Sequence, residues 1–329
     1  MYQITLLDKT SITQINQCLD LLDRSFGKGL DYYRWKHNVN GDYSIEEYTF
    51  CIFKDDLCIA TTQVIINEMF ILKKPYRFGI LCDGATHKDY RRLGLFEKLL
   101  SHINTFCSQK DVTFVYSTGN AKSRNALLKL GFEDFFSSYK ATKRVRYTHT
   151  AMKGYNFLLT VFGKLVVKQN NDIREVSIEE YSTFFAAQKN KFDITCEKSQ
   201  EYLKWRLDET TGTYSVFGSF DKNKKLQAVL VLKKSKNGFY IVDAIYKENM
   251  LYLNQLLKYT YSLAMLNKNI IKINSIHNNF KGIKKVFQNN NYKITKSDSS
   301  TLLYVLNSDF KIPYNQLENM HYMRIDKNE

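Results

Sequence analysis

One stretch of the chain reads Gly84-Ala-Thr-His-Lys-Asp-Tyr-Arg91-Arg92-Leu93-Gly94-Leu95-Phe96. It follows an apolar run at Phe78–Cys82 and leads into a helical pattern at Glu97–Lys110, which predicts a strand, a basic turn and a helix start. Such a turn gathers backbone N–H groups and a helix N-terminus around one point, which favours a bound anion. The glycine allows close approach of the backbone to a ligand, and the two arginines suit phosphate oxygens. The stretch therefore predicts a diphosphate site.

A basic turn without a ligand is the alternative interpretation of this stretch. Helix starts favour acidic side chains because of the helix dipole, so Arg91 and Arg92 are locally unfavourable there. A bound anion would remove that conflict, and we therefore prefer the anion site.

The loop Arg91-x-x-Gly94-x-Phe96 resembles the acyl-CoA loop of the GNAT acyltransferase superfamily, Arg/Gln-x-x-Gly-x-Gly/Ala, and departs from it at Phe96. Downstream, Thr113–Asn120 predicts a buried strand, and Ala121–Leu130 predicts a short helix closed by Gly131-Phe132. This order is similar to the strand, Asn, helix and Leu-Gly-Phe segment of that superfamily. The resemblance covers roughly residues 48–136. It implies an α/β fold with a mixed sheet and an acyl-CoA cofactor, acetyl-CoA or another.

The resemblance also assigns residues to the cofactor. It implies that the strand end contacts the pantetheine arm, that the loop holds the diphosphate, and that an asparagine on the neighbouring strand lies by the arm. These residues are Gly84, Ala85, Thr86, Arg91, Arg92, Leu93, Gly94, Leu95, Phe96 and Asn120.

The catalytic groups are less well marked. In the family an acceptor amine attacks the thioester, which requires a base for the amine and an acid for the leaving thiolate. Asp83, just before the strand end, is the candidate base. The position where many members carry a tyrosine acid is Leu127 here, and nothing in the sequence distinguishes Tyr116 from Tyr139 as a substitute.

A second copy of the module is predicted by an internal repeat. Trp35 and Trp205, the only two tryptophans, each precede an aromatic hairpin, a further strand and a helix. The pattern predicts a GNAT-like acyl-CoA-binding domain at residues 1–148, an interdomain segment at 149–164 and a second GNAT-like domain at 165–329. The second has Glu248 and no glycine where the first has its basic loop, so we expect it to have lost CoA binding and to serve the acceptor.

The composition limits the partners and the compartment. A net charge of +15 favours anionic partners and counts against a polycationic acceptor, while the absence of long basic runs counts against nucleic acid. The six cysteines have no metal-ligand spacing, and Met1–Thr10 carries no secretory signal, so we expect no metal site and a cytoplasmic protein. The apolar segment Tyr155–Val167 is too short to span a membrane, which takes about 20 residues. We expect an interdomain helix covered by both halves, with surface attachment as the alternative.

These observations predict an N-acetyltransferase of the tandem GNAT type, similar to proteins of surface-polysaccharide biosynthesis. The expected reaction moves an acyl group from acyl-CoA to an amine of a small, anionic acceptor such as a nucleotide-linked amino sugar. Two alternatives stay open: a Fem-like transferase that uses aminoacyl-tRNA, and a non-catalytic module that binds acyl-CoA.

Overall fold

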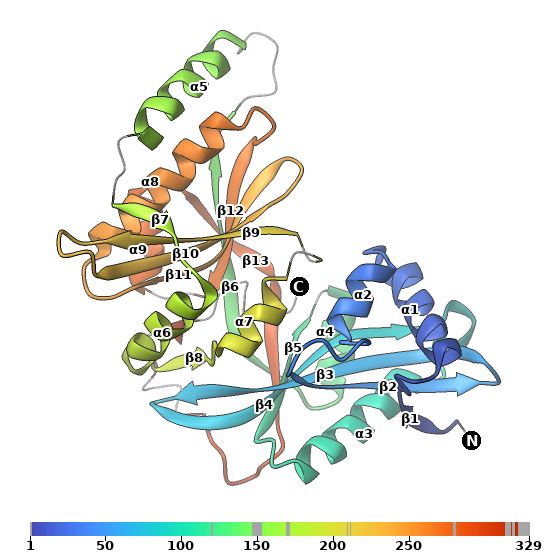
Figure 1. Cartoon of the computed structure of the whole chain (residues 1–329). Helices are drawn as coiled ribbons and strands as arrows, with labels where there is room; N and C mark the ends of the chain where they lie inside the picture. Colours follow the sequence, from blue (N-terminus) through green and yellow to red (C-terminus); the bar gives the residue numbers. More distant parts are fainter. Residues whose placement is uncertain are drawn as a thin grey trace. The chain divides into compact units, whose positions relative to one another are not determined.

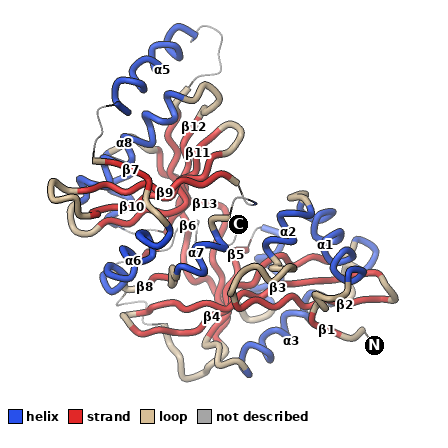
Figure 2. The backbone as a smooth tube through the Cα atoms, viewed as in Figure 1, coloured by secondary structure: helices blue, strands red, loops and turns tan. Residues whose placement is uncertain are grey.

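The protein has a mixed α/β fold, seen in a computed structural model (Figures 1 and 2). The structure describes residues 2–119, 121–146, 153–168, 172–208, 210, 212–278, 281–312, 317 and 320–321. The chain forms two compact units. Unit 1 comprises Met1–Phe136 and Asp298–Tyr314, and unit 2 comprises Ser137–Ser297 and Asn315–Glu329.

Unit 1 is built on a mixed sheet. Its strands, in spatial order, are β1 (Ile4–Leu6), β2 (Glu46–Lys54), β3 (Leu57–Ile71), β4 (Lys74–Thr86), β5 (Phe114–Gly119) and part of β13 (Lys293–Val305). Neighbouring strands are antiparallel except for the parallel pair β4–β5. Residues of β2 alternate between the two faces, so that Phe50 and Ile52 pack in one apolar cluster while Cys51 packs in another.

Helices cover both faces of this sheet, as Figure 1 shows. The helices are α1 (Ile12–Phe26), α2 (Leu30–Lys36), α3 (Leu95–Gln109) and α4 (Ala121–Lys129). Ser11 begins α1 by accepting a hydrogen bond from the N–H of Gln14, and Gly27 ends it with a left-handed φ of 66°. Buried side chains of α1 and α2 form one cluster with the sheet, and those of α3 form the other.

Unit 2 has a second mixed sheet. Its strands, in spatial order, are part of β6 (Glu133–Arg144), β12 (Lys272–Asn278), β11 (Gly238–Tyr246), β10 (Leu226–Lys234), β9 (Thr213–Phe220) and β7 (Ile173–Glu175). Its helices are α5 (Lys153–Lys168), α6 (Ile178–Gln188), α7 (Gln200–Arg206), α8 (Met250–Leu266) and α9 (Lys281–Asn289). The short strands β8 (Ile194–Cys196) and β14 (Met320–His321) pair in parallel.

The two units repeat one topology. In unit 1 two antiparallel pairs, β2–β3 and β3–β4, are followed by α3 and the parallel pair β4–β5. In unit 2 the pairs β9–β10 and β10–β11 are likewise followed by α8 and the parallel pair β11–β12. The predicted repetition of strand order is confirmed, and Trp35 and Trp205 are buried at matching places before β2 and β9.

The last strand of each sequence repeat pairs with a strand of the other repeat. In β13, Ser300–Val305 pairs with β5 of unit 1, whereas in β6, Ser138–Arg144 pairs with β12 of unit 2. The compact units are therefore not consecutive in sequence. The domain bounds 1–148 and 165–329, which were predicted from the sequence repeat, stay a prediction.

The segment predicted to connect the halves forms α5, whose one face packs on α8. A helix there was expected. Its coverage by both halves is wrong, because five large apolar side chains of α5 are between 43% and 68% exposed. They are Tyr155, Phe157, Leu158, Val161 and Phe162.

The exchange of β13 makes a residue from the C-terminal half part of the core of unit 1. Leu302 is 0% exposed and belongs to the α3-side cluster. We expect Leu302→Ala to lower the unfolding free energy by about 2–5 kcal/mol. Hydrogen exchange should show the loss of protection in β4 and β5. Val305→Ala, at a partly exposed position of the same strand, is the control and should change little. Equal effects of the two substitutions would contradict this role of β13.

Candidate functional site

The end of β4 carries a β-bulge. Thr61 of β3 pairs with Ala85 and Gln63 pairs with Cys82, so that Asp83 and Gly84 together lie opposite the single residue Thr62. Asp83 has a φ of 52°, in the left-handed region that side chains other than glycine rarely adopt. The extra residue bends the strand and redirects its last residues.

Beyond the bulge, β4 and β5 are no longer paired. The last pair between them joins Leu81 to Ser117, although β4 continues to Thr86 and β5 to Gly119. Within the described part of the chain, residues 82–86 of β4 thus have no strand partner on the side toward β5. Backbone N–H and C=O groups require partners. An extended ligand that hydrogen-bonds like a strand can supply them.

The loop after β4 is held against the sheet at its start. The N–H of His87 donates to the carbonyl of Ile59 at 2.8 Å, and a short 3-10 helix follows at Lys88–Tyr90. The Nε of Arg91 donates to the carbonyl of Thr86 at 3.3 Å, which keeps this guanidinium at the strand end. Both Arg91 and Arg92 are exposed.

The N-terminus of α3 has no side-chain cap. Its N-cap residue is Gly94, with a φ of 70°, and no side chain accepts a hydrogen bond from the first turn. In unit 2 the equivalent helix, α8, is capped by Asn249, whose Oδ1 accepts from the N–H of Leu251 at 2.9 Å. Uncapped N–H groups and the positive end of the helix dipole favour an anion. The start of α3 in the first unit therefore lacks the side-chain cap that the start of α8 has in the second.

The two glycines of this site serve different purposes. A Cβ added at Gly94 would meet no protein atom within 4 Å, so the space beside it is open and its left-handed φ is what requires glycine. A Cβ at Gly84 would lie 2.8 Å from the ring of Phe96. Phe96, which departs from the family pattern, thus packs over the bulge, where Gly84 leaves room for its ring.

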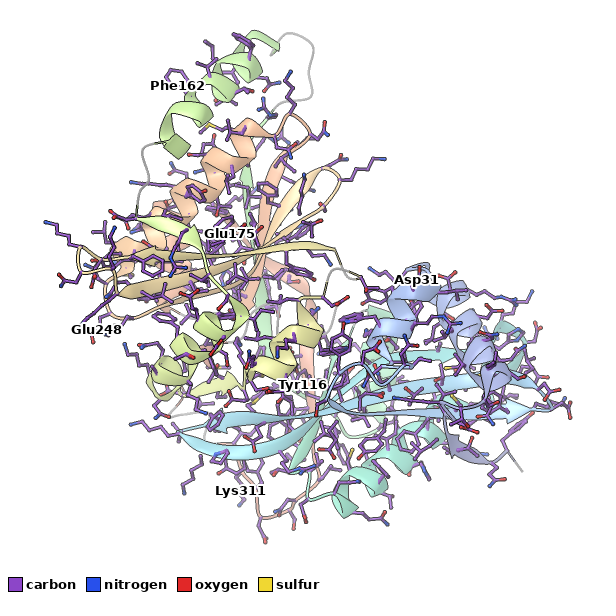
Figure 3. The ribbon with its side chains drawn as sticks, in the orientation of Figure 1. Asp31, Tyr116, Phe162, Glu175, Glu248 and Lys311 are labelled. Atoms are coloured by element: carbon purple, nitrogen blue, oxygen red, sulfur yellow. The ribbon has the colours of Figure 1, made fainter. Side chains whose placement is uncertain are left out.

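The structure brings most of the predicted site residues together. The strand end, Gly84 to Thr86, and the loop, Arg91 to Phe96, meet where β4 leads into α3. Asn120 lies outside the described residues. Leu127, at the usual tyrosine position, is 1% exposed in the core. Tyr116 is fully buried and stacks on Phe78, and Tyr139 belongs to unit 2, so neither lies in this loop (Figure 3 labels Tyr116).

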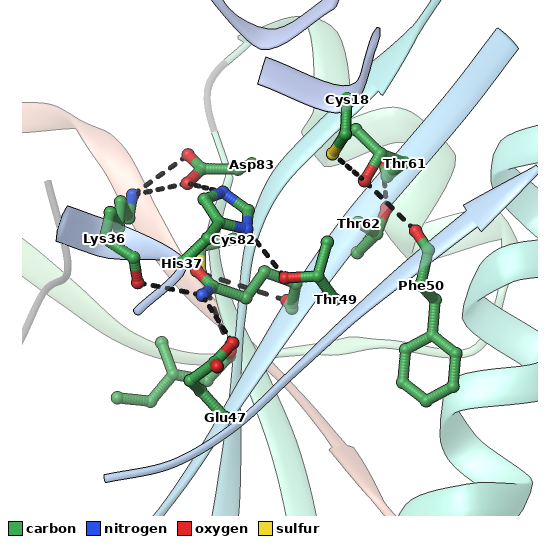
Figure 4. A network of polar contacts seen from close by, with 12 residues as sticks. Cys18, Lys36, His37, Glu47, Thr49, Phe50, Thr61, Thr62, Cys82 and Asp83 are labelled. Carbon is green, nitrogen blue, oxygen red and sulfur yellow. Dashed lines mark hydrogen bonds and ion pairs between the residues drawn. The ribbon is translucent and has the colours of Figure 1, made fainter. Parts of the chain in front are cut away.

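Asp83, the candidate base, lies in a buried ion pair (Figure 4). The Nζ of Lys36 is 2.9 Å from its carboxylate, and the Nε2 of His37 is 3.4 Å away. Both residues come from the end of α2, and the side chain of Lys36 is only 3% exposed. Burial raises the pKa of Asp83, but the Lys36 charge and the His37 hydrogen bond outweigh it and lower this pKa to about 2. A carboxylate with so low a pKa is a poor base at neutral pH.

An equivalent carboxylate occurs in unit 2. Asp83 and Asp243 each lie two residues after the last pair between their strand and its parallel neighbour. Asp243 contacts Lys198, His321 and the hydroxyl of Tyr181, and the first two lower its pKa to about 2 against the effect of burial. Because unit 2 lacks the basic loop and keeps the carboxylate, the shared feature indicates a role in structure. The sequence spacing did not reveal these contacts, since the partners of each aspartate come from distant segments.

Three cysteines that are scattered in the sequence also meet. The Sγ atoms of Cys18, Cys51 and Cys58 lie within 4.8 Å of one another, and all three residues are at most 1% exposed. They pack beside Leu19 and Leu22 under α1, as small apolar side chains do.

Comparison with known proteins identifies the class of this fold. Residues 7–133 match the family model of the acetyltransferase (GNAT) domain. Among curated proteins, none matches the sequence significantly. This part of the chain, which contains the bulge and the basic loop, is thus similar to a GNAT acetyltransferase domain.

Solved structures extend the likeness to both units. A protein of unknown function from Enterococcus faecalis, a probable N-acyltransferase, has a TM-score of 0.67 at 10% identity over 93% of this chain and 73% of its own. A GCN5-related N-acetyltransferase from Anabaena variabilis has a TM-score of 0.65 at 13% identity over 93% and 73%. N-myristoyltransferase from Saccharomyces cerevisiae, with bound myristoyl-CoA, has a TM-score of 0.61 at 10% identity over 97% and 84%. The whole chain therefore has the fold of GNAT-type acyltransferase enzymes.

Among the described residues, no helix combines the length and the apolar character needed to cross a bilayer.

The buried pair predicts a large effect of Asp83→Asn. The substitution leaves the Lys36 ammonium buried without its counter-charge, so we expect a loss of about 3–5 kcal/mol in unfolding free energy at pH 7. Glu46→Gln, which breaks the half-exposed pair with Arg77, is the control and should cost about 1 kcal/mol.

The pH dependence has a defined sign. Because the folded pKa of Asp83 lies below its unfolded value of about 4, its contribution to stability is present above about pH 4. That contribution is lost as the pH falls toward 2. Denaturant unfolding at pH 7 and pH 3 should show a smaller difference between wild type and Asp83→Asn at the lower pH.

Proposed function

We propose that this protein transfers an acetyl or other acyl group from acyl-CoA to an amine of a small, anionic acceptor. One observation carries the proposal. The uncapped N-terminus of α3, with two arginines before it, adjoins the end of β4, which pairs with β3 but has no described partner on its β5 side. A diphosphate joined to an extended, amide-containing arm is the ligand that satisfies both features, and acyl-CoA has that chemistry.

The residues then have separate tasks. The N–H groups at the start of α3, with Arg91 and Arg92, bind the diphosphate. The backbone of Gly84 to Thr86 bonds the pantetheine arm and directs the thioester toward β5. Asn120, on the chain just after β5, is proposed to contact the same arm.

The chemical step is a direct aminolysis. The acceptor nitrogen forms a bond to the thioester carbon, the C–S bond breaks, and the amine loses a proton while the CoA thiolate gains one. We propose that Asp83 is a positioning residue, because its ion pair with Lys36 holds the bulge that redirects the strand end. Since Leu127 replaces the usual tyrosine, the thiolate leaves without that acid.

The acceptor is proposed from charge and from the differences between the units. A net charge of +15 raises the encounter rate of anionic molecules and disfavours polycations. Unit 2 keeps the fold and has a capped α8 with Glu248 before it, so we propose that it has lost CoA binding and serves the acceptor (Figure 3). A nucleotide-linked amino sugar combines the required amine and negative charge, which agrees with a role in surface-polysaccharide synthesis in the cytoplasm.

Binding of CoA tests the site directly. At about 100 times its dissociation constant, CoA should stabilise the protein by roughly 2.7 kcal/mol, seen as a thermal shift. Arg91→Glu with Arg92→Glu should remove the shift by placing negative charge at the diphosphate. Lys222→Glu with Lys224→Glu changes the net charge equally on an exposed turn of unit 2 and should keep the shift. A shift that survives the arginine substitutions would place CoA elsewhere.

Turnover tests the acceptor. We expect release of free CoA thiol from acetyl-CoA with a nucleoside-diphosphate amino sugar and little release with spermine. The rate at low acceptor concentration should fall as salt rises, since exposed charges are screened over about 8 Å at physiological ionic strength. CoA binding without turnover on any amine would indicate a binding module, and a preference for spermine would contradict the anionic acceptor.

A further inference from the structure

The helix α5 packs on unit 2 with one side and exposes large apolar side chains on the other. On the side toward unit 2, Leu159 is buried, and the backbone carbonyl of Asn156 and the hydroxyl of Thr160 accept hydrogen bonds from Arg146, at 2.7 and 2.9 Å. At Gly163 an added Cβ would lie 3.0 Å from the Cβ of Met265 on α8. The helix is therefore held by Leu159 together with polar and small residues, and its other large apolar side chains are left for the opposite side.

Its large apolar side chains lie on the other side. We call Tyr155, Phe157, Leu158, Val161 and Phe162 the outer face of α5; they are 43–68% exposed. At 100° per residue they fall within one half of the helix circumference, and Figure 3 shows Phe162 on the outside. A helix that only covered a core would be turned the other way. This outer face is thus suited to an apolar partner.

The same end of unit 2 is bordered by basic residues. The chain end of β6, the β10–β11 turn and the segment entering β12 are adjacent, because Lys272 pairs with both Gly238 and Arg144. Residues 140–146, 232–238, 266–272 and α5 itself contain no aspartate or glutamate. Their exposed basic residues, which we call the basic edge, are Arg144, Lys234, Lys236, Lys268 and Lys272.

A cavity opens at this end as well. It has a volume of about 600 Å³ and lies between β9–β11 and the last turn of α8. Phe217, Leu232, Phe239 and Leu266 form its apolar wall, while Lys234 and Lys268 of the basic edge line it too. Apolar walls beside lysines match an acyl chain with an anionic head group.

We propose that unit 2 binds the surface of an anionic lipid bilayer through the outer face of α5 and the basic edge. Aromatic and aliphatic side chains enter the boundary between head groups and acyl chains, and the lysines and arginine contact the head groups. A second copy of the chain is a poorer occupant, since two such edges, both basic and without carboxylates in these segments, would repel each other. The proposal concerns unit 2 alone and is independent of the acyl-CoA site.

Vesicle co-sedimentation of the full chain tests the apolar part. We expect binding to vesicles of phosphatidylcholine with one quarter phosphatidylglycerol, and much weaker binding to pure phosphatidylcholine. Phe157→Ser with Phe162→Ser should weaken binding roughly tenfold for each phenylalanine withdrawn from the apolar phase. Ile12→Ser with Leu251→Ser is the control: these residues are 74% and 53% exposed on α1 and at the start of α8, and binding should be retained.

A matched pair of triple variants tests the charge. Lys234→Gln, Lys236→Gln and Lys268→Gln should weaken binding to the anionic vesicles by about one hundredfold, at about fivefold per basic side chain. Lys222→Gln, Lys224→Gln and Lys225→Gln remove the same charge from the β9–β10 turn, at the other end of β10, and should have little effect.

Several results would overturn the proposal. One is equal binding of wild type and the α5 variant, and another is equal loss in the two lysine variants. A third is a dimer at micromolar concentration that the α5 substitutions convert to monomer, because that would assign the outer face to a second copy. Thermal melts of all variants should match the wild type, since every changed side chain is exposed.

Discussion

The pairing of a carboxylate with a buried lysine, just beyond the last pair of two parallel strands, is the interaction on which both units depend. Asp83 in unit 1 and Asp243 in unit 2 each neutralise a buried lysine and contact a histidine. Burying an ion pair stabilises a fold little in itself, but removing one partner leaves a charge that the core cannot solvate. The ion pair therefore restricts where the two segments that carry its partners can lie. In unit 1 it fixes the α2 end against the bulge of β4, and the divergence of β4 from β5 follows from that bulge.

The two units show how one topology can carry two different helix N-termini through a few residues. In both units a strand continues past its last pair with its parallel neighbour and then leads into a helix. In unit 1 the helix starts at Gly94 with no side-chain cap, after a loop that carries two arginines. In unit 2 the side chain of Asn249 bonds the first turn of α8. A helix whose first turn is capped by a side chain has fewer N–H groups for an anion, so the capacity to bind an anion can differ between the units without a difference in fold.

On the surface of unit 2, the attachment of α5 determines which of its sides is exposed. Arg146, 5% exposed, ties α5 to α8 through hydrogen bonds to both helices. Polar attachment of this kind leaves the apolar side of the helix exposed, next to an edge that is basic and lacks acidic residues. Hydrophobic area and positive charge act together at an anionic interface, whereas either alone is weak.

The sequence by itself determined the local features. The apolar run before a basic turn and the two tryptophans before two hairpins predicted the strand-to-helix loop and the repeat, because each pattern depends on residues close together in the chain. The mixed sheet was implied by the resemblance to the GNAT superfamily. Only the tertiary structure decided what depends on distant residues. The exchange of β6 and β13 could not be predicted, since an amphipathic strand fits either sheet. The role of Asp83 changed once Lys36 and His37, over forty residues earlier, were found beside it and held its pKa near 2. The apolar pattern of α5 predicted a helix, but which of its faces is covered was settled by a hydrogen bond from Arg146 and a close contact at Gly163, neither of which periodicity can reveal.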